Sequence, residues 1–385
     1  MEFIFHIGSH KTGTSSIQNF LARNRKNLVR HGIYYAPGKN GGRNINHLGS
    51  SLAGDRMEEV RQFLENTVKA AKKANVTKIL FSGESLYAMS SFFGSLVGRH
   101  IEDYWKSETQ IITRLANACT EAGASSVRAV CYLRPQDDFI ESLYNQFVKQ
   151  YPGYTHDIGA FYQTSDPVGD YSGHIDLWIE QFGDQSVAVY PYDPAAPALI
   201  DHFVLSVLGI VNTEGFQEPG VNVNESLTAE ILTFKLILNR IGLPPAEGLL
   251  ASRVISRIAR DMRKKQNQSR LVLLPPELRV QIIEENNPGN RKLAKHYGWD
   301  ESNGLFPVIS PDNIPAPLPV STSDLLEILL RYKMEMSKTD VRLEIFFRRA
   351  IRAMLNRAPV LEYFLGGVRR VLYWRRLHLE RMGRL

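Results

Sequence analysis

A short glycine-bounded segment near the amino terminus constrains this chain more than any other feature. An apolar run at residues 3–7, Phe-Ile-Phe-His-Ile, predicts a buried strand, and helical spacing of apolar residues begins at Ile17. Between them, Gly8 and Gly13 bound a polar loop that turns tightly and approaches a ligand closely, because neither glycine carries a Cβ. A strand, a glycine-rich loop and a helix amino terminus in this order are typical of a phosphate-binding turn, in which backbone N–H groups and the helix dipole face an anion.

The position of the lysine distinguishes this loop from the ATP-binding type. In the pattern G-x-x-x-x-G-K-[ST] the lysine follows the second glycine directly, whereas here Thr14 occupies that place and the lysine is Lys11. This arrangement resembles the 5′-phosphosulfate loop of sulfotransferases, whose donor is 3′-phosphoadenosine 5′-phosphosulfate (PAPS). The resemblance implies that the donor is bound by Gly8, Lys11, Thr12, Gly13, Thr14 and Ser15. It also implies that Lys11 neutralises charge on the oxygen between sulfate and 5′-phosphate. The plainer alternative is an ordinary glycine-rich turn between a strand and a helix.

A second segment adds to the resemblance. Residues 126–133 predict a strand, which Arg134 follows, and Ser142 lies eight residues further along a predicted helix. In the sulfotransferase family an arginine and a serine at this spacing hold the 3′-phosphate of the donor. The other reading is a surface ion pair between Arg134 and Asp137 or Asp138, with Ser142 as an ordinary helical residue. Two motifs in the family's order and at its separation favour the phosphate-binding reading. The Arg-Lys-Gly element that some family members carry late in the chain is not found here.

Two residues are candidates for the base that deprotonates an acceptor hydroxyl. Glu84 lies two residues beyond a predicted strand at 76–82, and related carbohydrate sulfotransferases use a glutamate. Its alternative role is charge stabilisation at a helix amino terminus. His47 lies in a predicted polar loop and could bind the acceptor, act as the base or have no role. His10 is expected to act as a spacer in the phosphate loop. The resemblance implies no metal, because Lys11 and Arg134 supply the positive charge.

The alternation of strands and helices predicts an α/β fold with a parallel sheet flanked by helices, followed by a helical extension. Ligands in such sheets bind beyond the carboxyl ends of the strands, where both phosphate motifs and Glu84 lie. Strands are expected near 2–7, 76–82, 126–133 and 186–190. Helices are expected near 15–30, 57–74, 109–122, 136–150, 172–182, 196–209, 225–241, 248–266 and 276–297.

The composition is that of a globular protein, with 43% apolar and 22% charged residues. Cys119 and Cys131 both lie in predicted core elements, so a disulfide framework is not expected. The sequence contains no run of 18 apolar residues, so we expect no membrane-spanning helix. The first strand begins near Glu2, which leaves no room for a signal peptide. These features predict a cytoplasmic protein.

The basic charge is concentrated at the carboxyl terminus. Residues 342–385 contain eleven arginines, no lysine and three glutamates, a net charge of +8, whereas the whole chain carries +6. We expect a catalytic domain at 1–305, a proline-rich linker at 306–322 and a basic helical region at 323–385. Basic helices with interleaved aromatic residues can contact an anionic membrane. The alternatives are packing against the catalytic domain or a dimer contact. No motif for nucleic-acid binding is recognised.

These features together predict a PAPS-dependent sulfotransferase that acts on a hydroxyl or amine acceptor, in particular a glycan or glycolipid. The alternatives are a P-loop nucleotide kinase or NTPase, and a non-enzymatic membrane-associated scaffold with a vestigial nucleotide site. Thr14 in the usual place of the lysine, together with Arg134 and Ser142, argues against the kinase. The sequence contains no feature that indicates the oligomeric state.

Overall fold

The structure is a computed structural model that describes residues 1–93, 100–165, 167–192, 199–218, 226–263, 272–299, 305–306, 316–317 and 319–337. The chain forms two compact units, each discontinuous in sequence. Unit 1 comprises residues 1–143, 158–224 and 274–315, and unit 2 comprises residues 144–157, 225–273 and 316–385. Within the described residues, no helix combines the length and the apolar character needed to cross a membrane.

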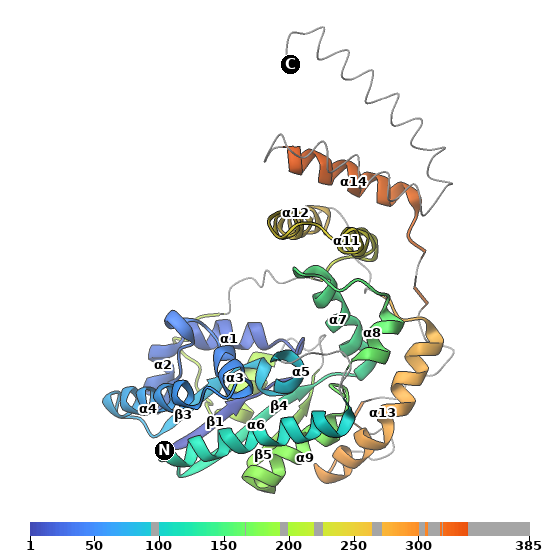
Figure 1. Ribbon diagram of the computed structural model, residues 1–385. Coiled ribbons are helices and arrows are strands. Elements are labelled where there is room, and N and C mark those ends of the chain that lie inside the picture. The colour runs from blue at the N-terminus through green and yellow to red at the C-terminus, as the bar shows by residue number, and fades with distance from the viewer. Residues whose placement is uncertain are drawn as a thin grey trace, which may run out of the picture. The chain divides into compact units, whose positions relative to one another are not determined.

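Unit 1 contains a five-stranded parallel sheet with helices on both faces, as the sequence predicts (Figure 1). Its strands are β1 (Glu2–His6), β2 (Ile33–Tyr35), β3 (Lys78–Ser82), β4 (Ser126–Leu133) and β5 (Val187–Pro191), in the order β2-β3-β1-β4-β5. Every neighbouring pair is parallel, and Phe5 of β1 lies opposite Phe81 of β3 and Ala129 of β4. Strand β2 was not predicted, because three residues are too few to establish an alternating pattern.

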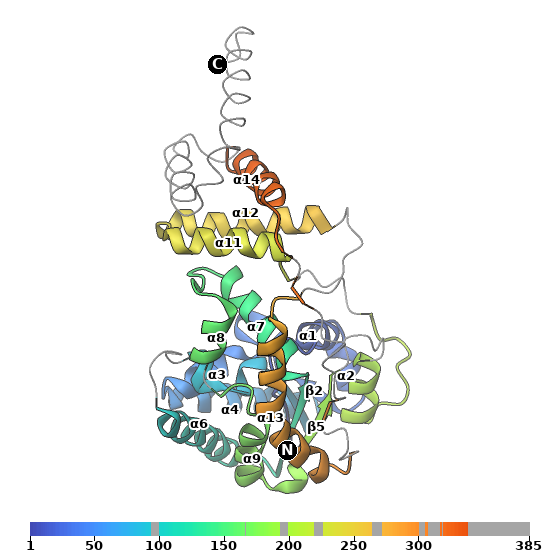
Figure 2. The same ribbon diagram turned by 90° about the vertical axis from the view of Figure 1, so that its right-hand side faces the viewer.

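Alternation along the strands divides the core between the two faces of the sheet. On one face, Ile4, Leu80 and Val130 pack with α1 (Thr14–Arg23), α2 (Arg25–Arg30) and a π-helix (Phe203–Val207). On the other face, the stacked rings of Phe5 and Phe81 lie 4.7 Å apart. That face is covered by α4 (Met57–Lys73), α6 (Ile101–Glu121) and α9 (Tyr171–Phe182), which pack one beside the next. Figure 2 shows α1 and α2 on one side of the sheet and α4 and α6 on the other.

Two local sequence signals show how the helices end. Gly32 and Gly123 have φ values of +76° and +81° just after helices, the left-handed conformation that commonly ends a helix at a glycine. The helix expected at 15–30 is instead interrupted at Asn24, whose φ is −104° and ψ is 16°. The Asn24 side-chain amide donates to the Phe20 carbonyl at 2.9 Å and to the Gln217 carbonyl at 2.8 Å. A side chain that bonds to backbone in this way competes with helix continuation.

The remaining elements of unit 1 connect the strands and hold the site. The helices are α3 (Asn46–Ala53), α5 (Met89–Phe93), the first half of α7 (Gln136–Lys149), α8 (Ile158–Thr164), α10 (Leu199–His202) and α13 (Pro276–His296). Short 3-10 turns occur at η1 (Lys39–Gly41), η2 (Glu84–Leu86) and η3 (Asp184–Ser186). The helix expected at 196–209 is therefore α10 followed by the π-helix.

Unit 2 is helical. Its described helices α11 (Ala229–Ile241), α12 (Pro245–Arg263) and α14 (Thr322–Ser337) pack together, with the rings of Phe234 and Tyr332 5.5 Å apart. This grouping differs from the predicted division, in which residues 323–385 form a region of their own, because α14 buries its apolar face on α11 and α12. Most of the predicted linker, at 307–315 and 318, and the basic segment 342–385 lie outside the described residues.

Candidate functional site

The order of the strands places three loops at one position on the sheet. The connections from β1 and β4 leave in opposite directions, and ligands of such sheets bind in the crevice where this occurs. Residues 8–13 follow β1, Arg134 follows β4, and Glu84 begins the η2 turn after β3 on the other side of β1. Parallel pairing therefore brings these loops to the same edge, as the sequence predicts.

The loop after β1 depends on two residues with left-handed backbone. Gly13 has a φ of +73°, and a Cβ there would lie 2.3 Å from Leu199 Cδ2. Lys11 has a φ of +68°, an uncommon conformation for a residue with a side chain. A Cβ at Gly8 would lie 2.7 Å from Thr14 Cγ2, so the loop folds closely onto the start of α1. Left-handed residues that alternate with right-handed ones turn backbone N–H groups toward a common anion-binding hollow.

The loop is fixed by hydrogen bonds from its side chains to backbone carbonyls. The Ser9 hydroxyl donates to the Tyr132 carbonyl of β4 at 3.0 Å, and the Thr12 hydroxyl donates to the Ser9 carbonyl at 2.7 Å. Among the described residues, the N–H groups of residues 12–15 have no backbone carbonyl partner. Because α1 begins at Thr14, these groups belong to the end of a helix that lacks intrahelical acceptors. The loop can therefore accept an anion.

His6 supports the loop from the end of β1. Its ring is buried, and burial lowers its pKa to about 3, so His6 is neutral at physiological pH. Nδ1 lies 2.9 Å from the Ser82 hydroxyl, and Nε2 lies next to Gly8. The charge of the loop therefore comes from Lys11 and the helix dipole, with no contribution from this histidine.

Glu84 contacts the phosphate loop, which the sequence did not indicate. The Thr14 hydroxyl donates to Glu84 Oε2 at 2.6 Å, and His10 Nδ1 lies 3.9 Å from Glu84 Oε1. Burial lowers the pKa of His10, while the Glu84 carboxylate acts in the opposite direction. About a quarter of the Glu84 side chain is exposed, at 24%. The carboxylate is thus both accessible and positioned by the loop.

His47 lies on α3, so the polar loop expected around it is wrong. Its ring packs edge-on against Phe63 of α4, with centroids 4.8 Å apart, and burial lowers its pKa. The neighbouring Asn46 accepts a hydrogen bond from the Ser85 hydroxyl at 3.2 Å, one residue after Glu84. No described contact joins His47 itself to the phosphate loop or to Arg134. The structure therefore places Glu84, but not His47, in contact with the loop.

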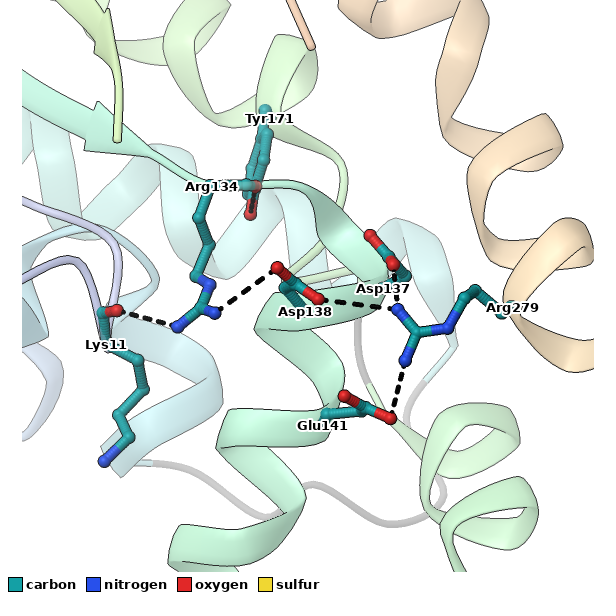
Figure 3. Close-up of polar contacts among 7 residues, drawn as sticks. All are labelled: Lys11, Arg134, Asp137, Asp138, Glu141, Tyr171 and Arg279. Carbon is teal, nitrogen blue, oxygen red and sulfur yellow. Dashed lines mark hydrogen bonds and ion pairs between the residues drawn. The ribbon is translucent and has the colours of Figure 1, made fainter. Parts of the chain in front are cut away.

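Arg134 lies directly beside the phosphate loop. Its Nη1 donates to the Lys11 carbonyl at 3.0 Å, and its Cζ lies 5.9 Å from the centroid of the Tyr192 ring. Burial lowers the pKa of Arg134, although the guanidinium stays charged. Its Nε is buried without a hydrogen-bond partner among the described residues. Figure 3 shows the Lys11 side chain extending away from this guanidinium, so the two cations occupy separate parts of the site.

The sequence offered an ion pair with Asp137 or Asp138 as the alternative role for Arg134, and an ion pair with Asp138 is present. Arg134 Nη2 lies 3.6 Å from Asp138 Oδ2. Ser142 is one helical turn beyond Asp138, on the same face of α7, and is partly buried. The predicted 3′-phosphate serine therefore lies on the helix face from which Asp138 contacts Arg134.

Two residues of this region were not among the predicted site residues. Asp138 was named in the sequence analysis only as a possible ion-pair partner of Arg134, from which it is four residues away. Arg279 of α13 could not be found from the sequence, because it is 141 residues from Asp138. Among the described residues, no group of three or more His, Cys, Asp or Glu side chains is arranged to hold a metal ion.

Comparisons with known proteins give a structural likeness but no match in sequence. No protein-family model matches the chain, and no curated protein matches it in sequence. A crystal structure of a sulfotransferase from Alicyclobacillus acidocaldarius aligns with a TM-score of 0.35 and 16% identity, over 62% of this chain and 90% of that chain. The function of this chain must therefore be inferred from the residues of its own site.

Proposed function

We propose that this chain is a sulfotransferase that moves a sulfuryl group from PAPS to a hydroxyl or amine acceptor. The observation that carries the proposal is the 3.0 Å contact between Arg134 and the Lys11 carbonyl. It joins the arginine after β4 to the glycine loop after β1, so that two cationic elements lie together at the edge of the sheet. A donor with phosphates at both its 5′ and 3′ positions requires two such elements.

The loop suits the 5′-phosphosulfate end of the donor. Residues 12–15 offer N–H groups without backbone partners, and α1 adds the positive end of its dipole. Lys11 would neutralise the oxygen that leaves with the 5′-phosphate. The Thr12 and Thr14 hydroxyls already donate to Ser9 and Glu84, so these residues would bind the donor through backbone N–H groups. We therefore expect the hydroxyl groups of Thr12 and Thr14 to stabilise the loop and not to bind the donor.

Arg134 suits the 3′-phosphate. A guanidinium offers a planar set of donors that matches phosphate oxygens, and Arg134 has an Nε without a described partner. Ser142, on the facing side of α7, would add a hydroxyl. These contacts would hold the donor in line for transfer, and positioning is the main requirement of this class of reaction.

The transfer step needs a base but no redox chemistry. The bond between sulfur and the 5′-phosphate oxygen breaks, and a new bond forms between sulfur and the acceptor oxygen. The acceptor proton passes to a base, for which the Glu84 carboxylate is the leading candidate and the His47 imidazole the second. Adenosine 3′,5′-bisphosphate (PAP) leaves with the negative charge that Lys11 and the loop stabilise. A glycan or glycolipid acceptor is proposed from the sequence resemblance.

Calorimetry with three ligands tests the proposal. PAP should bind, ATP with Mg²⁺ should bind far more weakly, and adenosine 5′-monophosphate (AMP), which lacks the 3′-phosphate, should bind less tightly than PAP. Transfer from sulfur-labelled PAPS to cell-extract acceptors then identifies the product. Tight binding of ATP–Mg²⁺ with no preference for PAP would favour the nucleotide kinase instead. PAP binding without transfer to any acceptor would favour the vestigial scaffold.

A further inference from the structure

Three carboxylates surround one buried arginine at the start of α7. Arg279 is 2% exposed and pairs with Asp137 through Nη1 and with Glu141 through Nη2, the latter at 2.7 Å. Its Nη1 also lies 3.4 Å from Asp138 Oδ1. Figure 3 shows these carboxylates on one helix, with Arg279 approaching from α13. Arg279 therefore compensates the negative charge that α7 places close to the proposed phosphate subsite.

Asp138 differs from the other two carboxylates because it contacts both arginines. Its Oδ2 faces Arg134 Nη2 at 3.6 Å, and its Oδ1 faces Arg279 Nη1 at 3.4 Å. Asp137 and Glu141 contact Arg279 but have no described ion pair with Arg134. Asp138 thus lies between a deeply buried arginine and the arginine proposed to read the 3′-phosphate (Figure 3).

We propose that Asp138 is an internal competitor of the 3′-phosphate for Arg134, and that Arg279 is the positioning residue that retains Asp138 when the phosphate binds. This inference rests on the proposed function, because it concerns the same donor site. A phosphate dianion carries more charge than a carboxylate and offers more oxygens to a guanidinium, so it can displace Asp138. Arg279 still faces Asp138 Oδ1 after displacement, which avoids leaving a nearly buried carboxylate without a cation.

The ion pair between Asp138 and Arg134 lowers the affinity for PAP, although Asp138 itself makes no contact with PAP. A ligand that carries the 3′-phosphate must break the Arg134–Asp138 pair, whereas a ligand with a 3′-hydroxyl need not. The affinity for PAP is therefore reduced by the fraction of time that Asp138 occupies Arg134. When PAP dissociates, the return of Asp138 to Arg134 blocks rebinding. Asp138 is thus expected to favour release of the product.

Two variants that remove the same charge separate this role from a general electrostatic effect. D138N removes the competitor, and E141Q is the matched control, since Glu141 pairs with the same arginine and has no described ion pair with Arg134. D138N should bind PAP about fivefold more tightly, because Arg134 is then no longer occupied by a competing carboxylate when the ligand arrives. PAP association, measured by stopped flow, should become faster by a similar factor, because Asp138 no longer occupies Arg134 in the free protein. AMP binding should not change, and E141Q should resemble the wild type for both ligands.

The double variant R134A/D138N tests whether the effect depends on Arg134. Without Arg134, the gain in PAP affinity that D138N produces should disappear. Unchanged or weaker PAP binding by D138N would overturn the inference and show that Asp138 only orients Arg134. An equal gain in E141Q would also overturn it, since the cause would then be net charge. Thermal unfolding checks that each variant folds. If D138N does not fold, D138S takes its place in the same measurements. Wild-type protein that fails to bind PAP would instead overturn the proposed function, and this inference with it.

Discussion

The hydrogen bond between Thr14 and Glu84 adds an anchoring role to the proposed role of Glu84 as the base, and single substitutions can separate the two. At 2.6 Å, the bond fixes the start of α1 to the η2 turn, while a quarter of the Glu84 side chain remains accessible. A base must reach the acceptor proton, whereas an anchor need only hold Thr14. If Glu84 is the base, turnover depends on its negative charge. If Glu84 is only an anchor, donor affinity depends on its hydrogen bond to Thr14.

We expect Glu84→Gln to lower turnover by about 10²–10⁴-fold, the usual contribution of a base, with little change in PAP affinity. A glutamine oxygen can still accept the Thr14 hydroxyl, so the anchor is kept while the base is lost. The matched variant Thr14→Val removes the bond and keeps the carboxylate, and it should affect PAP affinity more than Glu84→Gln does. Steady-state transfer and calorimetry measure the two effects. An active Glu84→Gln beside an inactive His47→Ala would move the base to His47.

Lys11 is expected to act on charge that develops during transfer. Lys11→Ala should lower turnover by about 10²–10³-fold, as the loss of one electrostatic stabiliser commonly does, and leave the unfolding midpoint near that of the wild type. Lys69→Ala is the control, because Lys69 on α4 is 72% exposed and remote from the loop in sequence. Turnover of Lys11→Ala close to that of Lys69→Ala would contradict the role of the lysine.

At the scale of elements, the junction of β1 and α1 depends on Gly13. A side chain at φ +73° costs about 1–2 kcal/mol, and a Cβ there also meets Leu199 at 2.3 Å. Gly123 is the matched control, because its φ is +81° but a Cβ there would meet no atom within 4 Å. Gly13→Ala should therefore lose more free energy of unfolding in urea than Gly123→Ala, and only Gly13→Ala should lose PAP affinity. Equal losses would show that the loop adapts to a side chain.

The contact between α5 and α6 predicts a pH dependence of stability. Glu108 of α6 is buried, accepts from the N–H groups of Met89 and Ser90 at 2.9 and 2.8 Å, and has its pKa raised to about 7 by burial. A carboxyl with a raised pKa holds its proton more tightly in the folded state. Its contribution to stability is therefore present at low pH and is lost as pH rises from about 4.5 to about 7.

Glu108→Gln should remove this contribution. The free energy of unfolding of the wild type, relative to that of Glu108→Gln, should fall by about 3 kcal/mol between pH 4 and pH 8. Urea denaturation of both proteins across this range measures the difference, and other titrating groups cancel in the comparison. A difference that is constant with pH, or that grows with pH, would contradict the protonated state of Glu108.

At the scale of the whole molecule, the charge distribution separates the carboxyl-terminal segment from the rest. Residues 342–385 carry a net charge of +8 in a chain of net charge +6, so the remaining residues are slightly acidic. The proposed donor site lies in unit 1, and its predicted residues all precede residue 143. Loss of the basic segment should therefore affect surface binding and not donor binding.

Truncation after residue 341 tests this separation and keeps α14, which packs on α11 and α12. The truncated protein should bind PAP like the full chain and bind anionic vesicles less, since each basic residue near such a surface contributes about 1 kcal/mol. Co-sedimentation with anionic and neutral vesicles, at low and high salt, measures the effect, because salt screens it. Equal sedimentation of both proteins would exclude the membrane role and favour packing or a dimer contact.

The sequence by itself determined the features that depend on neighbours along the chain. The apolar run before Gly8, the alternating strands and the helical patterns were sufficient to predict a parallel sheet with a glycine-bounded loop after β1. Gly32 and Gly123 were also predictable, because a left-handed cap after a helix favours glycine. Parallel pairing then required Arg134 and Glu84 to lie at the same edge as the loop.

The tertiary structure decided which side chains meet at that edge. Thr14 and Glu84 are 70 residues apart, and Arg279 is 142 residues from Asp137, so no local pattern links them. The break at Asn24 depends on a carbonyl 193 residues away, and the place of α14 depends on apolar contacts with α11 and α12. Such pairs form because folding brings distant segments together. The charged groups and hydrogen-bond donors that become buried then require partners within the protein. The sequence therefore indicated which loops share one edge of the sheet, and packing determined that Asp138 is shared between two arginines.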